Sequence, residues 1–454
     1  MKFTGITSLL FGMVLSSSCS KFLDIQPPTD TAETDKIFKN ESTALSAIKG
    51  LYTQVRGSST AILNGGLSFY PGVGSDELYN PSNLSTLQAF YTNGLLSDNI
   101  TTGSMWLNSY QFIYTANLIL EALNNSTSID SGPKAGFRGE MLYMRGLVYF
   151  YLVNLFGDVP LVISSDYIGN STIPRTSTTT VYNRVLDDLL ESQRLLLPSN
   201  GSLPNTRISY MATTALLSRV QLFIGQWEQA EKNATIVIGS GKYRLEPDLN
   251  KVFLSSSPES IFQISKVNTN TSEGGAFIPS TSTALPVYAA TEYLMNSFGL
   301  SDGRRLNWLK ANTIAGKQYY YPFKYKVRSS TTTTEFNIVQ RLAEIYLIRA
   351  EAFARQNKKE QAEFDLNLVR NRAGLESYVA SNSTQLLDSI MVERQRELFS
   401  EWGHRWFDLK RTKRANVVLA ERKAPNWQPT DSLYPIPASE IIYNPLLTQN
   451  PGYE

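Results

Sequence analysis

Apolar side chains in the last third of the chain recur at the spacing of a helix face, in two successive segments. From Leu342 to Phe353 they return every three or four residues, which places them on one side of a helix. A short polar break, Gln356 to Lys358, precedes a second segment of the same kind, which ends at Gly374. Glycine just after the last periodic residue is a typical helix stop. The short break predicts two antiparallel helices that pack against each other.

A similar arrangement occurs earlier in the chain. Residues Met211 to Ile224 form one periodic segment, which is followed by Gly225, and a second segment runs from Trp227 to Gly239. Alanine recurs in both hairpins where the helices would cross, and small residues there let helix axes approach closely. Two hairpins of similar length predict tetratricopeptide-like units, a class of helical repeat.

Four further segments extend this helical scaffold. The stretch from Arg138 to Phe156 is apolar on nearly all sides, which predicts a buried helix. Trp106 to Leu123 and Val181 to Leu197 are its expected neighbours, and Ser42 to Val55 completes a first pair. We therefore predict a mainly α protein with about four tetratricopeptide-like helix pairs as its scaffold.

Three long segments, at about 58–104, 240–340 and 412–454, are rich in Ser, Thr, Asn, Gly, Pro and Tyr. Loops of this length are uncommon as plain connections and often carry function. Short strands are predicted at Ser260 to Ser265 and near Tyr319 to Val327. We expect irregular, tyrosine-bearing loops on one side of the helices, with the function located in them.

The start of the chain has the pattern of an export signal. Lys2 precedes an apolar stretch, Ile6 to Leu15, which is too short to span a bilayer. Small residues follow, and then Cys19, the only cysteine in the chain. This pattern predicts a lipoprotein signal peptide over 1–18, lipidation of Cys19 and a polar tether over 19–40. Ser16 stands where such sites usually carry leucine, and ordinary secretion with a free thiol is the alternative.

Composition excludes several kinds of chemistry. His404 is the only histidine, so zinc sites built from several histidines are impossible. With Cys19 lipidated, cysteine-based catalysis is excluded as well. The formal charge of +2 argues against a nucleic-acid partner. No run resembles an EF-hand, and we expect neither a metal nor a cofactor. The chain has 24 tyrosines against 6 tryptophans, and tyrosine combines an apolar ring with a hydroxyl that suits polar ligands.

Five segments together resemble one family. Residues 393–411 read ERQRELFSEWGHRWFDLKR, residues 341–352 read RLAEIYLIRAEA, and residues 149–160 read YFYLVNLFGDVP. The chain closes with YPIP at 434–437 and QNPGY at 449–453. Taken in their order along the chain, these segments resemble the signature of the SusD/RagB outer-membrane nutrient-binding lipoproteins. The resemblance extends from Cys19 to the end and implies a single domain over 41–454.

The resemblance implies a function. Members of this family are anchored by lipid to the outer face of the outer membrane, where they cap a TonB-dependent transporter of the SusC kind. They bind oligosaccharides, or less often peptides, and deliver them to that transporter. They are not enzymes. We therefore expect a glycan-binding import protein, with peptides or another nutrient as the alternative cargo.

Sugars present C–H faces that stack on aromatic rings, and hydroxyls that need polar partners. Two loop segments offer both, and the family places ligand contacts in the first of them, including an acidic residue like Asp76. Packing within the loops is the alternative role for each aromatic residue. The candidate ligand contacts are Tyr70, Asp76, Tyr79, Asn80, Tyr91, Tyr288, Trp308 and Tyr320.

Other conspicuous residues have a better structural explanation. Charged residues within 393–411 lie three and four positions apart, where helix side chains pair, so we expect an ion-pair network with His404 packed inside it. The segment 302–305 resembles a structural element of the family. A helical glycoside hydrolase is a further hypothesis, but it needs two carboxylates on either side of a bond, and the neighbours Asp76 and Glu77 cannot supply them. A scaffold that binds only protein is the last alternative.

Overall fold

The computed structural model describes residues 38–57, 61–197 and 203–453. The predicted signal peptide, Cys19 and most of the predicted tether lie outside these ranges, so lipidation stays a prediction. Among the described residues, none of the helices has the length and the unbroken apolar run that crossing a bilayer requires.

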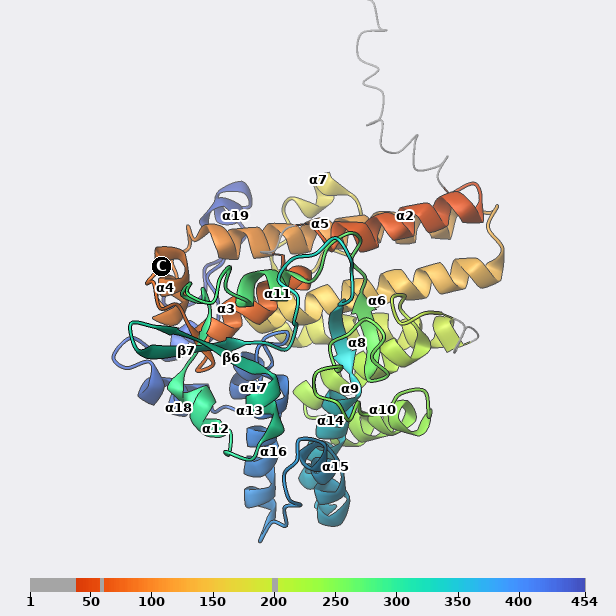
Figure 1. Ribbon diagram of the computed structural model, residues 1–454. Helices are drawn as coiled ribbons and strands as arrows, with labels where there is room; N and C mark the ends of the chain where they lie inside the picture. The colour runs from red at the N-terminus through yellow and green to blue at the C-terminus, as the bar shows by residue number, and fades with distance from the viewer. Residues whose placement is uncertain (1–37, 58–60, 198–202, 454) are drawn as a thin grey trace, which may run out of the picture.

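A long buried helix, α6 (Ser131–Phe156), forms the centre of the scaffold. The helices α5 (Ile100–Asn125) and α8 (Thr178–Leu196) pack along it, and α2 (Glu41–Gln54) lies against α5 and α6 (Figure 1). The predicted neighbours of α6 are therefore confirmed. Gly139 explains the close approach of α8, because a Cβ there would lie 2.7 Å from the Leu196 side chain.

The two predicted hairpins are also confirmed. The first consists of α9 (Tyr210–Phe223) and α10 (Trp227–Gly239), and Gly225 makes the turn with a φ of +77°. The second consists of α14 (Leu342–Arg355) and α15 (Lys359–Arg372), with α14 packed against α10 and against α16 (Ser383–Leu398). Local apolar periodicity was sufficient to predict these pairs because each buries one face against its own partner.

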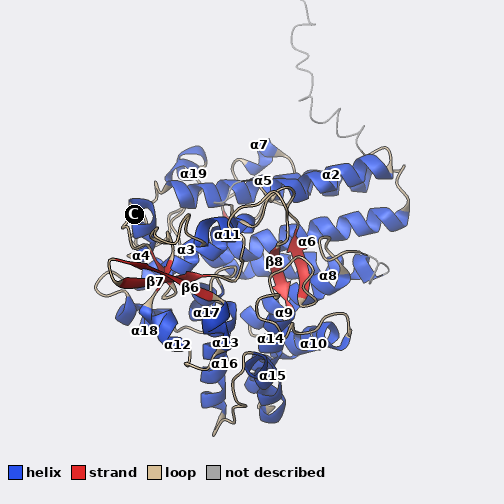
Figure 2. Cartoon of the chain, viewed as in Figure 1, coloured by secondary structure: helices blue, strands red, loops and turns tan. Residues whose placement is uncertain are grey.

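Strands occur as short antiparallel pairs (Figure 2). The pair β4 (Ser260–Ile264) and β8 (Asn337–Arg341) confirms the first predicted strand. The second prediction, Tyr319 to Val327, is wrong in its bounds. β7 covers Lys317–Pro322 and pairs with β6 (Leu309–Ile314) through a turn in which Ala315 and Gly316 both have positive φ. Proline at the end of β7 cannot donate to a ladder, which fits the early end of the strand.

Short elements fill the loop-rich segments. Two further strand pairs are β1 (Leu78–Tyr79) with β5 (Ala289–Ala290), and β2 (Val159–Pro160) with β3 (Arg175–Thr176). The short helices are η2 (Ile62–Gly66), α3 (Leu67–Gly74), α4 (Ser85–Tyr91), α7 (Tyr167–Asn170), α11 (Ser272–Phe277), α12 (Glu292–Ser297), α13 (Gly303–Asn307), α17 (His404–Arg411), α18 (Ala415–Arg422), η4 (Pro429–Ser432) and α19 (Ala438–Tyr443). Figure 1 shows α4, α12, α18 and the β6–β7 hairpin together at one side, away from α10 and α15.

The charged segment 393–411 forms a buried ion-pair network, partly within its own helices and partly with other elements. Arg411 pairs with Asp408, three positions away on the same helix, at 2.7 Å, which confirms part of the prediction. The Glu397 carboxylate pairs with Arg304 at 2.9 Å and with Arg341 at 2.5 Å, and it also contacts Arg372. These three arginines come from three other elements, which the spacing within the segment did not indicate. A buried arginine costs free energy unless a carboxylate pairs with its charge. The three arginines here share the Glu397 carboxylate.

His404 lies inside the protein, as predicted from its place in the charged segment. It is 5% exposed, and burial together with the nearby charge of Arg219 lowers its pKa well below the ordinary value. The ring is therefore neutral at physiological pH. Trp427, in the last loop-rich segment, is buried against Trp406 at 6.0 Å between ring centres.

Candidate ligand-binding site

A hollow of about 670 Å³ lies between the loop-rich segments, and we call it the α12 pocket. Its walls come from β1, the end of α4, β5, most of α12, α13, β7 and the end of α18. Its lining residues are Asp76, Tyr79, Tyr91, Ala290, Thr291, Glu292, Tyr293, Met295, Asn296, Arg305, Lys317, Gln318, Tyr320, Arg422 and Lys423. Four of the predicted contacts are therefore brought together: Asp76, Tyr79, Tyr91 and Tyr320.

Four tyrosine rings surround this hollow. Tyr79 and Tyr91 lie with ring centres 6.5 Å apart, and strand pairing of β1 with β5 places Tyr79 opposite Ala289, close to α12. Tyr320 stands on β7 and donates its hydroxyl hydrogen to the Gln318 side chain at 2.9 Å. Tyr293, on α12, is 42% exposed. Half-buried and exposed rings around one concavity offer faces on which an apolar ligand surface can stack.

Asp76 anchors the base of the pocket. Arg405 donates to its two carboxylate oxygens at 2.8 Å each, and Arg422 contacts one of them as well. The backbone carbonyl oxygen of Asp76 accepts the hydroxyl of Thr291, which begins α12. Asp76 is only 1% exposed, so its carboxylate chiefly fixes two arginines, while its backbone carbonyl holds the start of α12.

Two cationic residues at the end of α18, Arg422 and Lys423, form another wall of the α12 pocket. Arg422 lies over the Tyr293 ring at 4.8 Å. The Lys423 ammonium group lies 4.0 Å from the centre of the Tyr91 ring and donates to the carbonyl oxygen of Val73 at 2.8 Å. Burial lowers the pKa of Lys423 to about 7, because no carboxylate compensates for the lost hydration.

The other four predicted contacts do not line the α12 pocket. Trp308 is fully buried and donates its indole N–H to the Leu249 carbonyl oxygen at 2.8 Å. Tyr288 is 7% exposed and stacks inside the core on Phe69.

Tyr70 and Asn80 also serve the fold. Tyr70 packs on Phe90 with ring centres 4.8 Å apart. The Asn80 side chain donates to the Val287 carbonyl oxygen at 2.7 Å and accepts from the Leu84 N–H at 2.8 Å, which ties two loops together. The sequence places these aromatic and amide residues in irregular segments, where we expected them to be accessible to a ligand. In the structure, short helices and strands pack their side chains into the interior.

Sequence reasoning missed several residues that line the pocket: Tyr293, Arg305, Lys317, Arg422 and Lys423. Tyr293 lies within the tyrosine-bearing stretch already singled out, and weighting every tyrosine there would have found it. No local pattern indicated that Arg422 meets Asp76 or that Lys423 lies over the Tyr91 ring, because such contacts are visible only in the folded chain.

Comparisons with known proteins agree with this architecture. A family model described as the SusD family matches residues 303–453, and one described as starch-binding and associating with the outer membrane matches residues 21–222. The curated SusD-like protein P2 of Formosa agariphila is 26% identical, over 94% of this chain and 95% of the relative. The chain belongs to the SusD/RagB family.

Solved structures of SusD-like proteins share the fold. A SusD superfamily protein from Bacteroides vulgatus aligns with a TM-score of 0.80 at 20% identity, over 92% of this chain and all of the other. A laminarin-binding SusD-like protein aligns with a TM-score of 0.77 at 24% identity, over 91% of this chain and all of the other. At this level of identity, the likeness shows the fold of this SusD/RagB member.

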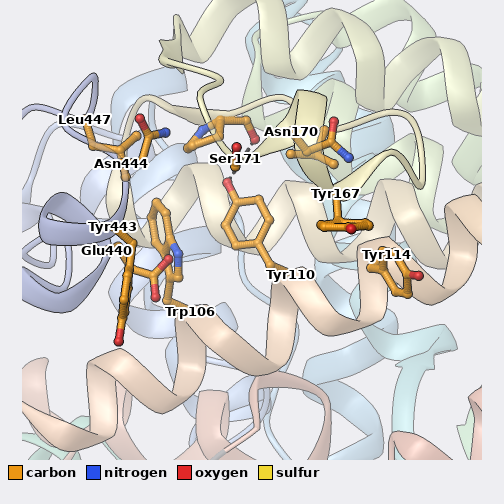
Figure 3. A pocket seen from close by; sticks show the side chains of 12 residues that line it. Trp106, Tyr110, Tyr114, Tyr167, Asn170, Ser171, Glu440, Tyr443, Asn444 and Leu447 are labelled. Atoms are coloured by element: carbon orange, nitrogen blue, oxygen red, sulfur yellow. Dashed lines mark hydrogen bonds between the residues drawn. The ribbon is translucent and has the colours of Figure 1, made fainter. Parts of the chain in front are cut away.

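This SusD/RagB protein has a second hollow of about 320 Å³, which we call the α5 pocket (Figure 3). Its floor is Trp106 and Tyr110 from α5, and the Tyr110 hydroxyl donates to the Pro160 carbonyl oxygen at 2.9 Å. Tyr167 of α7 and Tyr443 of α19 stand at its rim, 64% and 81% exposed. Glu440 is the only charged side chain in its lining. None of the predicted contacts lies here.

Carboxylates suited to hydrolysis are scarce around the α12 pocket. Asp76 is bound by arginines, and Glu77 is buried away from the hollow, where burial raises its pKa to about 7. Glu292 is exposed at the rim. Within the described ranges no three His, Cys, Asp or Glu side chains gather as a metal site would require. The absence of a required metal stays a prediction.

Proposed function

We propose that this protein is a cell-surface lipoprotein, anchored through Cys19 to the outer leaflet of the outer membrane. It binds an oligosaccharide in the α12 pocket and delivers it to a SusC-like TonB-dependent transporter. It performs no catalytic step of its own. Peptides are the alternative cargo in the same role.

The observation that carries this proposal is the set of tyrosine rings around the α12 pocket. Tyr79, Tyr91, Tyr293 and Tyr320 face one hollow that also holds charged and amide groups. Pyranose rings need an apolar platform for their C–H faces and hydrogen-bonding groups for their hydroxyls. A volume of about 670 Å³ is large enough for a short oligosaccharide.

Two comparisons support the class of ligand. The matched family model over residues 21–222 carries the description starch-binding, and one solved structure of the same fold is described as laminarin-binding. Both concern glycans. Association with the outer membrane is part of the same family description and supports the proposed location.

Binding is tested by titration calorimetry of the purified protein against a panel of oligosaccharides and, separately, of peptides. We expect binding of at least one glycan, with no shortening of its chain after prolonged incubation. Binding of peptides alone would replace the cargo in this proposal, and release of shorter sugars would show an enzyme.

Location and partner need a test in cells. Cys19→Ala should lose membrane retention, while the released protein keeps its affinity for the glycan. Co-purification of a TonB-dependent transporter with the lipidated protein, and not with an unrelated outer-membrane lipoprotein, tests the proposed partnership. Loss of both retention and affinity in the Cys19 variant would contradict the division between anchor and binding domain.

A further inference from the structure

The α12 pocket carries an excess of positive charge. Four cationic side chains line it, and only two carboxylates do. The cationic side chains are Arg305, Lys317, Arg422 and Lys423, and the carboxylates are Asp76 and Glu292. A concave surface on which one sign of charge dominates concentrates the electric field and attracts ligands of the opposite charge.

The carboxylate at the base does not cancel this excess. Asp76 is shared by Arg422 and by Arg405, which reaches it from behind the pocket at 2.8 Å. One carboxylate therefore meets two guanidinium groups, and the trio keeps a net positive charge. Glu292, at the rim, makes no ion pair with any residue in the described part of the chain.

Two of the cations have no carboxylate partner of their own. No acidic side chain of the described residues lies within ion-pair distance of Arg305 or Lys317. Lys317 is exposed on β7 and has only the Tyr319 ring beside it, at 5.1 Å. Arg305 follows Arg304, whose guanidinium group is fully buried among carboxylates, but Arg305 itself reaches the pocket. Unneutralised cations beside stacking rings suit an anionic ligand.

Lys423 adds a buried amino group that is cationic below about pH 7 and that an anionic ligand can stabilise. Its nearest groups are the Val73 carbonyl oxygen, the Tyr91 ring and its neighbour Arg422, and none of them is an anion. An anion in the pocket would compensate for the cost of burying this charge. The α5 pocket offers a contrast, since its lining holds a carboxylate and no cation.

We propose that the oligosaccharide bound in the α12 pocket is acidic and carries carboxylate or sulfate groups, which Arg305, Lys317 and Arg422 recognise while the tyrosine rings stack on the sugar faces. This inference rests on the proposed glycan-binding function and specifies its substrate class. A neutral glucan would use the rings and leave the cations without a partner.

The test compares ligands that differ only in charge. Oligogalacturonate and its fully methyl-esterified form share the same sugar chain, and a sulfated oligosaccharide with its desulfated form makes a second pair. Titration at 20 mM and 300 mM NaCl should show tighter binding of the charged member of at least one pair, with weakening as salt rises. Neutral laminari- and malto-oligosaccharides complete the panel.

Variants of exposed or half-buried residues test the two signs of charge separately. Lys317→Gln and Arg305→Gln should each weaken binding of the acidic ligand about two- to fivefold, and Glu292→Gln should strengthen it by a similar factor. Lys310→Gln is the matched control, because Lys310 is exposed on the paired strand β6 and lies outside the lining. Its affinity should equal that of the unchanged protein.

The outcomes separate this inference from the proposed function. Equal binding of charged and neutral glycans, with no response to salt or to these variants, would overturn the acidic preference and leave glycan binding in place. Binding of acidic peptides but of no glycan would overturn both. Failure to bind any ligand of either panel would also count against both.

Discussion

Arg405 binds both carboxylate oxygens of Asp76, 329 residues earlier in the chain, at 2.8 Å each. This pair joins α17, part of the buried charged segment, to the loop that begins the α12 pocket. Asp76, expected from the family resemblance to be a ligand contact, therefore supports the site through this pair.

Removal of the Asp76 carboxylate should destabilise the folded protein. Asp76→Asn leaves two guanidinium groups near the interior without their shared anion, and we expect a loss of about 3 kcal/mol in the free energy of unfolding. Urea denaturation measures it. Glu292→Gln is the control in the same pocket, because Glu292 is exposed, and its stability should change by less than about 0.5 kcal/mol. Equal stabilities would assign Asp76 to the ligand instead.

Removal of one tyrosine ring from each pocket tests which of the two pockets binds the glycan. Tyr293→Ala removes a 42% exposed ring of the α12 pocket, and Tyr443→Ala removes an 81% exposed ring of the α5 pocket. We expect the first to weaken glycan binding about tenfold and the second to leave it unchanged, since stacking on aromatic rings contributes on this scale. Neither should lower the melting temperature by much. The reverse order would move the site to the α5 pocket.

Lys423 should make stability rise with pH. Its pKa is about 7 in the folded protein, where burial disfavours the charge, against an ordinary value of 10.5. Between these values the unfolded chain binds a proton that the folded chain does not, so the free energy of unfolding increases with pH by at most about 1.4 kcal/mol per unit.

Comparison with Lys423→Met isolates this contribution. Urea midpoints of both proteins at pH 7 and pH 9 give the difference, and the variant should lack the rise that the lysine contributes. The variant should also be the more stable of the two at pH 6, where the unchanged protein carries a buried charge. Parallel pH profiles would show that Lys423 stays protonated in the folded state.

Substitution of Glu397, whose carboxylate several arginines of the ion-pair network share, should strongly destabilise the protein. Burial opposes the charge of Glu397, but Arg372, Arg341 and Arg304 outweigh it and hold its pKa well below the ordinary value. Glu397→Gln should cost about 3 to 5 kcal/mol at neutral pH, because three buried guanidinium groups each lose one of their carboxylate partners.

The same carboxylate predicts a pH dependence of the same sign as that of Lys423, but at acid pH. A depressed carboxylate pKa contributes stability above the unfolded value, and this stability is lost as the solution is acidified. The variant should therefore show a smaller loss of stability than the unchanged protein between pH 5 and pH 3. Glu376→Gln, at an exposed loop position, serves as the control and should follow the unchanged protein.

The helical scaffold could be predicted from the sequence because its signals are local. The hairpins α9–α10 and α14–α15 each bury a face against their own neighbour, so periodicity within thirty residues or so was sufficient. The strand bounds failed at β7, where the partner is another short strand and the turn is Ala315-Gly316 instead of a common asparagine–glycine pair.

The pocket could be predicted only in part, because its walls come from distant segments. Tyr79, Tyr91 and Tyr320 were found by composition. Trp308 was placed there too, but Phe253 and Phe399 enclose its ring in the core, with ring centres 5.6 and 6.4 Å away. Contacts between residues hundreds of positions apart decide which aromatic ring faces solvent, and a single sequence does not record them.

Because its walls include Arg422 and Lys423, the α12 pocket can be completed only after most of the chain has been made. A chain that emerges N-terminus first during synthesis and export can form α5, α6 and α8 early, whereas Tyr91 and Asp76 must wait for partners more than three hundred residues behind them. Premature termination just before α18 would thus leave a helical body with an unfinished ligand site, so a bound ligand reports a chain that has emerged almost to its end.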